Sequence, residues 1–174
     1  QIVICIIFIV PMNPCSCGFF PDTKKCKCSI NEIIKYQNKI SQPILDRIDV
    51  SINVAPVEFN ELFDKKIVEN SKTIKERVLN AVDKQIYRYR EENFSYNSHL
   101  DNKGIKKYIK INYDIEDYLK AYFNEKALSA RGIYRVIKIA QTICDLSDEK
   151  HITKEHIKEA IFYRNERMRN GKNI

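Results

Sequence analysis

Residues 11–28 read PMNPCSCGFFPDTKKCKC and hold four of the six cysteines of the chain. These four cysteines form two Cys-x-Cys pairs, Cys15 with Cys17 and Cys26 with Cys28. The residues between the pairs include Gly, Pro, Asp and Thr, which favour a turning connection. Because such a turn brings the two pairs together, the sequence predicts a cysteine-pinned loop at this point.

The four thiols of this loop permit three arrangements. Four thiolates can close a tetrahedral shell around a structural zinc ion, and Lys24, Lys25 and Lys27 would offset the negative charge of this zinc tetrathiolate. The Cys-x-Cys spacing is less specific than Cys-x-x-Cys, so two disulfides, or reduced cysteines without a metal, remain open as alternatives. No histidine lies near the loop in sequence, which argues against a catalytic zinc.

An apolar run precedes the loop. Residues 2–10 (IVICIIFIV) carry no polar side chain, which is the pattern of a parallel β-strand covered on both faces. The run is shorter than the roughly 20 residues of a membrane span, and it lacks the basic leader and cleavage site of a signal peptide. Since a buried strand needs neighbours and the chain begins with Gln, we expect it to be the C-terminal part of a longer protein.

Beyond the loop, apolar residues recur mostly at helical spacing. A capping box at Ser29 and Glu32 predicts a helix that ends at Pro43, and residues 50–54 then alternate like a half-buried strand. A long amphipathic helix is predicted over about residues 72–92, with further helices after it. Three N-caps are expected in this region, at Thr73, Ser129 and Thr153.

This change of pattern divides the chain. We expect an α/β segment over residues 1–56, with the cysteine loop at 15–28, then a linker at 57–71, an all-helical domain at 72–164 and a basic tail at 165–174 that frays. Charged residues make up 30% of the chain, which is typical of a helix-rich globular protein. Several reduced cysteines and no export signal favour the cytoplasm.

The net charge of +7 is spread along the chain. A diffuse basic excess suits nucleic acid or another polyanion, and it equally suits a merely solvated surface.

Four motifs occur in one order: MNPCSCG at 12–18, CKC at 26–28, QPILDRIDV at 42–50 and LSARGIYRVIKIAQTICDL at 128–146. Together they resemble the C-terminal half of the magnesium-chelatase-like AAA+ ATPases, in the ComM/YifB branch. The resemblance implies an α/β remnant of a AAA+ (P-loop NTPase) core with a cysteine-pinned loop, followed by an all-α helical lid. It also implies a homo-oligomer, a hexameric ring that uses ATP with Mg2+ to remodel DNA, as in branch migration during DNA uptake and recombination.

The resemblance implies roles for three residues. Asn13 matches the sensor-1 position, where a side-chain amide orients the attacking water. Arg47 matches the arginine finger that one subunit presents to the ATP of its neighbour, with Asp46 and Asp49 flanking it. Arg131 matches the sensor-2 arginine at the start of a lid helix, where the helix end also attracts phosphate. Without the resemblance, the residues alone would indicate something simpler at each position. Asn13 would belong to a turn at the end of a strand, Arg47 would form an ordinary surface ion pair, and Arg131 would be an exposed arginine in the first turn of a helix.

Two family motifs are absent from these 174 residues: the phosphate-binding loop GxxxxGK[ST] and an acidic Walker-B strand. In the family both lie upstream, so this chain hydrolyses ATP by the family mechanism only together with that part. Two other functions therefore remain open. One is a true magnesium-chelatase motor subunit, against which the cysteine loop argues. The other is a non-catalytic, zinc-pinned nucleic-acid-binding module.

Overall fold

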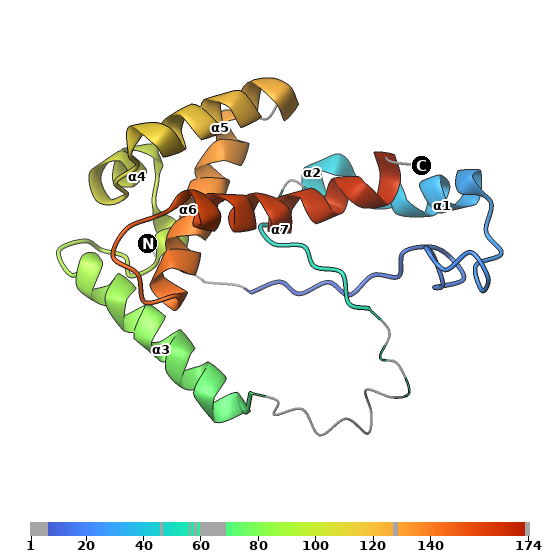
Figure 1. Cartoon of the computed structure of the whole chain (residues 1–174), viewed down its shortest axis with the longest axis horizontal. Helices are drawn as coiled ribbons and strands as arrows, with labels where there is room; N and C mark the ends of the chain where they lie inside the picture. The colour runs from blue at the N-terminus through green and yellow to red at the C-terminus, as the bar shows by residue number, and fades with distance from the viewer. Residues whose placement is uncertain are drawn as a thin grey trace. The chain divides into compact units, whose positions relative to one another are not determined.

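The computed structural model describes residues 7–45, 47–55, 57, 59, 69–126 and 129–172. Within these residues the chain forms helices and no β-strand. It divides into two compact units, Gln1–Ile48 with Arg167–Ile174, and Asp49–Glu166 (Figure 1).

The first unit contains two helices that follow the cysteine loop. In α1 (Ile30–Gln37), the Ser29 side chain accepts a hydrogen bond from the Glu32 amide, and the Glu32 carboxylate accepts one from the Ser29 amide at 2.8 Å. The predicted capping box is thus confirmed. Pro43 does not end this helix; it lies in the first turn of the short α2 (Gln42–Leu45), where no N–H is needed.

The two predicted β-strands are wrong for the residues that the structure describes. Of residues 2–10, residues 2–6 lie outside the described part, and residues 7–10 are irregular and exposed. Residues 50–54 are also irregular, with Val54 86% exposed. A strand needs a neighbouring strand to pair its N–H and C=O groups, and none is found among the described residues; the Ser51 amide instead donates to the Tyr163 carbonyl of helix α7 (Lys154–Lys172) at 2.9 Å. The α/β remnant is therefore not shown.

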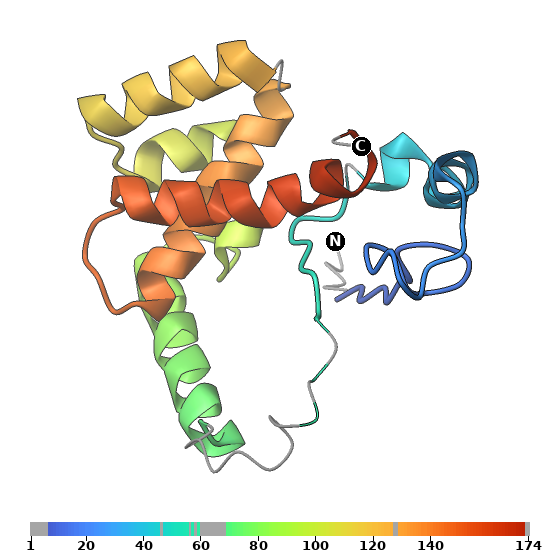
Figure 2. The same cartoon turned by 45° about the vertical axis from the view of Figure 1, so that its right-hand side comes forward.

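The second unit is a set of helices packed around α6 (Ala130–Leu146). The Ser129 side chain accepts a hydrogen bond from the Gly132 amide at 3.2 Å, so the predicted N-cap of α6 is confirmed. Figure 2 shows α6 at the centre of this unit, where it contacts α3, η2 and α4. The other helices are α3 (Ser71–Arg88), η2 (Asn97–His99), α4 (Asn102–Tyr108), α5 (Tyr113–Lys126) and α7 (Lys154–Lys172), which begins in this unit.

The other two predicted N-caps have different outcomes. Thr73 lies inside α3, because Asn70 is the N-cap and its Oδ1 accepts a hydrogen bond from the Thr73 amide at 2.9 Å. Thr153 caps α7 as predicted, since its hydroxyl accepts a hydrogen bond from the His156 amide at 3.5 Å. The basic end of the chain, which was expected to fray, is helical as far as Lys172.

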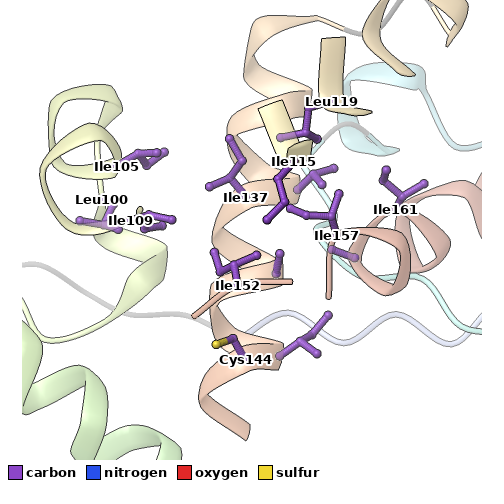
Figure 3. Packing of buried hydrophobic residues seen from close by; sticks show 14 of the residues in the cluster. Leu100, Ile105, Ile109, Ile115, Leu119, Ile137, Cys144, Ile152, Ile157 and Ile161 are labelled. Carbon is purple, nitrogen blue, oxygen red and sulfur yellow. The ribbon is translucent and has the colours of Figure 1, made fainter. Parts of the chain in front are cut away.

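Aliphatic side chains from α4, α5, α6 and α7 form one hydrophobic core. Figure 3 shows Ile115, Ile137 and Ile157, which come from three different helices, among the side chains of this cluster. Each such side chain contributes about 1.5–3 kcal/mol when fully buried. The buried side chains of the last two helices include Val136, Ile137, Ala140 and Ile143 on α6, and Ile157, Ala160 and Ile161 on α7.

A buried polar network joins α3 to α6. The Asp145 side chain is only 1% exposed, and both of its oxygens accept hydrogen bonds from the Arg88 guanidinium. Asp145 also accepts from Asn97 Nδ2 at 3.0 Å and from Gln141 Nε2 at 3.1 Å, while Asn97 Oδ1 accepts from the Tyr89 hydroxyl at 2.6 Å. Since the two Arg88–Asp145 hydrogen bonds depend on one alignment of α3 and α6, the network fixes how these helices pack.

Asp145→Ala should destabilise the chain by about 3–5 kcal/mol, because it leaves the partly buried Arg88 guanidinium without its carboxylate. Urea-induced unfolding followed by circular dichroism measures this change. The control is Glu116→Ala, which removes an exposed carboxylate that pairs with Lys120 at 3.1 Å and should have little effect. Equal effects of the two substitutions would show that the buried network does not hold the helices together.

Candidate functional site

The loop predicted from the sequence brings its four cysteine sulfurs together. All four Sγ atoms lie within 4.8 Å of one another. Cys15 Sγ is 3.3 Å from Cys17 Sγ and 3.8 Å from Cys26 Sγ, and the Cys17 and Cys26 sulfurs are 3.6 Å apart. Disulfide sulfurs lie about 2.05 Å apart, so these cysteines, with Cys28, are free. A tetrahedral zinc with bonds of about 2.3 Å places its sulfurs about 3.8 Å apart, so the sulfurs of this cluster are near enough to one another to share one ion.

Two tight turns give the loop this geometry. In the first, the Gly18 amide donates to the Cys15 carbonyl at 3.1 Å, and Gly18 has a φ of 82°, which glycine adopts without strain. In the second, Asp22 Oδ1 accepts a hydrogen bond from the Lys24 amide at 2.9 Å, and the Asp22 carbonyl accepts one from the Cys26 amide at 2.8 Å. These bonds turn the chain back, so the second Cys-x-Cys pair faces the first.

Contacts with α1 hold the loop in place. Gln37 Nε2 donates to the Pro14 carbonyl at 3.0 Å, and the α1 residue Ile33 is buried. The four sulfur-bearing residues differ in exposure: Cys15 is fully buried and Cys17 is exposed, whereas the other two are half-buried. The cluster therefore has one inner and one outer side.

The thiols of the cluster do not ionise alike. The Phe19 backbone amide, followed by the Cys15 side chain, lowers the pKa of Cys17 to about 6. The Cys28 backbone amide lowers the pKa of Cys26, but burial and the neighbouring Cys17 and Cys15 sulfurs raise it more, to about 12. Thiolates this close repel one another, so all four ionise together only around a cation. The cluster has the donor atoms and the charge of a structural zinc site.

The cysteine cluster contains no histidine or carboxylate, and no other group of three or more such residues is found in the described part of the chain. A zinc ion held by four thiolates has no open coordination position, so a metal bound here would be structural and not catalytic.

Arg47 is exposed, and its Nη1 donates to the Pro43 carbonyl at 2.7 Å. The two carboxylates that flank Arg47 in the sequence differ in what the structure describes. Asp46 lies outside the described residues, and Asp49 forms an ion pair with Arg135 at 3.0 Å. The Asp49–Arg135 pair could not be predicted from the sequence, because the two residues lie far apart along the chain and no local periodicity links them.

Asn13 and Arg131 are exposed and lie in different units. Asn13 lies in irregular chain just before the cysteine loop, so the strand end at which the sequence placed it does not form. Arg131 lies in the first turn of α6, as expected, beside a surface depression that Tyr134, Arg135 and Lys138 also line. Of the predicted site residues, the four cysteines are the ones that the structure brings together.

No helix within the described ranges combines the length and the apolar character that crossing a membrane requires.

Comparison with known proteins supplies two matching family models. The model of the magnesium chelatase subunit ChlI matches residues 4–62, and the model of the ChlI C-terminal region matches residues 68–164.

Individual curated proteins match over most of the chain. The chain is 30% identical to the uncharacterized protein YifB of Escherichia coli over 158 residues, and 30% identical to the YifB of Salmonella typhimurium over 159 residues. It is 32% identical to the competence protein ComM of Haemophilus influenzae over 157 residues. Each alignment covers 90% of this chain, which spans about 30% of the length of these relatives. Since the C-terminal model covers more than half of the residues, the chain belongs to the magnesium chelatase ChlI C-terminal family and is similar to the YifB and ComM proteins.

Proposed function

We propose that this chain is the C-terminal part of a magnesium-chelatase-like AAA+ ATPase of the ComM/YifB type, which assembles as a hexameric ring in the cytoplasm and uses ATP to remodel DNA. The observation that carries the proposal is the consecutive match of both family models, from residue 4 to residue 164. The residues Asn13, Arg47 and Arg131 stand within the family motifs in this span. The name of the relative ComM, a competence protein, supports a role in DNA uptake.

The exposed apolar residues before the cysteine loop support a larger core. Ile7, Phe8 and Ile9 are 83%, 74% and 84% exposed, although such side chains suit a strand buried in a sheet. We assign the missing partners of this apolar segment to the part of the protein that the curated relatives have in addition. The same part would carry the phosphate-binding loop and the acidic strand, so ATP and Mg2+ would bind mainly outside this chain.

This chain would contribute charge and orientation at the phosphates. Arg47 is exposed and carries a permanent charge that can bind two phosphate oxygens, which suits a residue that reaches the ATP of a neighbouring subunit. Arg131, in the first turn of α6, adds its charge to the positive end of the helix. The amide of Asn13 would orient the attacking water.

The surface of α4 suits a polyanion. Residues 102–112 carry four lysines and no acidic residue. Lys107 pairs with Glu92 at 2.7 Å, whereas the other three are exposed and have no hydrogen bond or ion pair with any described residue. We name these three, Lys103 and Lys106 of α4 and Lys110 two residues after it, the α4 lysine surface. Ammonium groups without carboxylate partners favour contact with a nucleic-acid backbone.

ATP hydrolysis by the full-length protein, measured with and without DNA, tests the proposed function. Stimulation by DNA is the expected result. Stimulation by a porphyrin-inserting partner, with no effect of DNA, would support the magnesium-chelatase motor alternative. DNA binding without any ATP hydrolysis would support the zinc-pinned binding module.

The first substitution to test is Arg47→Ala in the full-length protein. It should reduce turnover by up to roughly 10³-fold and leave ATP binding nearly intact, because an arginine finger acts on charge that develops during phosphoryl transfer. Steady-state ATPase rates and equilibrium binding of ATP measure the two effects. Arg90→Ala, which removes another exposed arginine, serves as the control and should retain the wild-type rate. A wild-type rate in Arg47→Ala would remove the role assigned to Arg47.

Replacement of all three residues of the α4 lysine surface by Gln should weaken DNA binding equally for all DNA sequences. It should also reduce the slope of log K against log salt by up to about 0.9 for each phosphate that these lysines neutralise in the wild type. Fluorescence anisotropy over a range of salt concentrations measures both quantities. The control replaces three lysines that already pair with carboxylates, Lys84, Lys120 and Lys158, and changes the net charge equally. Equal weakening in the two triple variants would mean that only total charge matters.

The cysteine cluster should carry about one zinc per chain in protein purified under reducing conditions, because four clustered thiolates bind zinc tightly. Cys26→Ser should lose most of the metal and lower the melting temperature. Cys144→Ala removes a buried cysteine of the helical core and should keep the zinc. Elemental analysis and thermal unfolding measure these outcomes. Less than about half an equivalent of zinc in the wild type would rule out the tetrathiolate site.

A further inference from the structure

One sulfur of the cysteine cluster is open to solution. Cys17 is exposed, whereas Cys15 is fully buried and the other two cysteines are half-buried. Lys24 and Lys27 are exposed on the same loop, and they give the cluster the electropositive surroundings in which reactive thiols occur. Cys17 is therefore the sulfur at which a dissolved oxidant reacts.

The sulfurs of Cys15 and Cys26 both lie close to that of Cys17, at 3.3 and 3.6 Å, and a disulfide bond is about 2.05 Å long. A bond between Cys17 and Cys15 would close a ring over Ser16 alone, and so short a loop is stiff and costly to close. Cys26 is nine positions from Cys17 in the sequence, and the turn in which the Asp22 carbonyl accepts from the Cys26 amide already brings them together. The geometry favours Cys26 as the partner of Cys17.

Contacts at the other two sulfurs favour the same pair. Cys15 Sγ accepts a hydrogen bond from the Phe20 amide at 3.5 Å, in its buried position. Cys28 Sγ lies 3.3 Å from the Ser16 hydroxyl oxygen. Either sulfur would have to give up its contact in order to turn toward Cys17.

We propose that Cys17 and Cys26 form a reversible disulfide when the loop meets a peroxide, with Cys17 as the sulfur that is oxidised first. The Cys17 thiolate attacks a peroxide oxygen; the O–O bond breaks, hydroxide leaves and a sulfenic acid forms. The Cys26 thiolate then attacks the Cys17 sulfur, and formation of the S–S bond expels a second hydroxide. The peroxide gains the two electrons that the two sulfurs lose, and a dithiol reductant reverses the reaction by thiol–disulfide exchange.

The disulfide leaves the cluster with two thiolates, those of Cys15 and Cys28. Two ligands do not close a tetrahedral shell, so a zinc ion held by the four cysteines is released. This consequence rests on the zinc site proposed above, whereas the disulfide itself does not.

The test treats the reduced full-length protein with a limiting amount of hydrogen peroxide and then alkylates the remaining thiols. Mass spectrometry of unreduced peptides identifies the first disulfide, because cleavage after Lys25 and Lys27 separates Cys26 from Cys28. A metal-sensitive dye follows the zinc. The first disulfide should join Cys17 to Cys26, about one zinc per chain should appear with it, and dithiothreitol should restore both thiols.

Two variants that each remove one cysteine of the cluster form a matched pair. Cys17→Ser and Cys28→Ser should both lose most of the zinc, so a difference between them does not come from the metal. Cys28→Ser should still form the disulfide between Cys17 and Cys26. In Cys17→Ser, oxidation of the loop thiols should be at least about tenfold slower, because the accessible sulfur is gone.

The outcomes separate this proposal from the zinc site. A first disulfide between other cysteines, a Cys17 oxidised without any disulfide, or equal oxidation rates in the two variants would overturn the proposal. Wild-type protein that carries zinc but resists peroxide would overturn it as well and would leave the zinc site standing. Protein without zinc that still forms the disulfide between Cys17 and Cys26 would support the proposal and contradict the zinc site.

Discussion

The helical unit depends on the burial of one face of α6. The apolar side chains of that helix form the centre of a core to which α4, α5 and α7 all contribute, and each buried aliphatic side chain adds about 1.5–3 kcal/mol. On another side of α6, Asp145 and the Arg88 guanidinium fix the position of α3. Because α6 is held from several directions, the arginines at its beginning, Arg131 and Arg135, project from a rigid support.

Features encoded by neighbouring residues could be predicted from the sequence. The capping box at Ser29, the cap at Ser129 and the convergence of the four cysteines each depend on a few consecutive residues, and the structure has all three. The displaced cap of α3 shows the limit of this approach, since Asn70 and Thr73 are both good N-caps and the sequence alone does not choose between them.

Features that depend on distant residues could not be predicted in this way. The strands expected at residues 2–10 and 50–54 need partners that the described residues do not provide, so their apolar patterns alone did not produce a sheet. The Arg88–Asp145 network and the Asp49–Arg135 pair join segments far apart along the chain. The roles of Asn13, Arg47 and Arg131 come from the family resemblance, because exposed polar residues carry no local pattern of their own.

The unequal burial of the cysteines has a chemical consequence. Cys15 is enclosed, whereas Cys17 faces solvent and ionises at a lower pH than an ordinary cysteine. An electrophile or a chelator that approaches from solution therefore meets the Cys17 sulfur first. Chemical damage to the loop would begin at Cys17, while the Cys15 sulfur stays shielded, so a metal ion that the loop held would be lost in steps and not all at once.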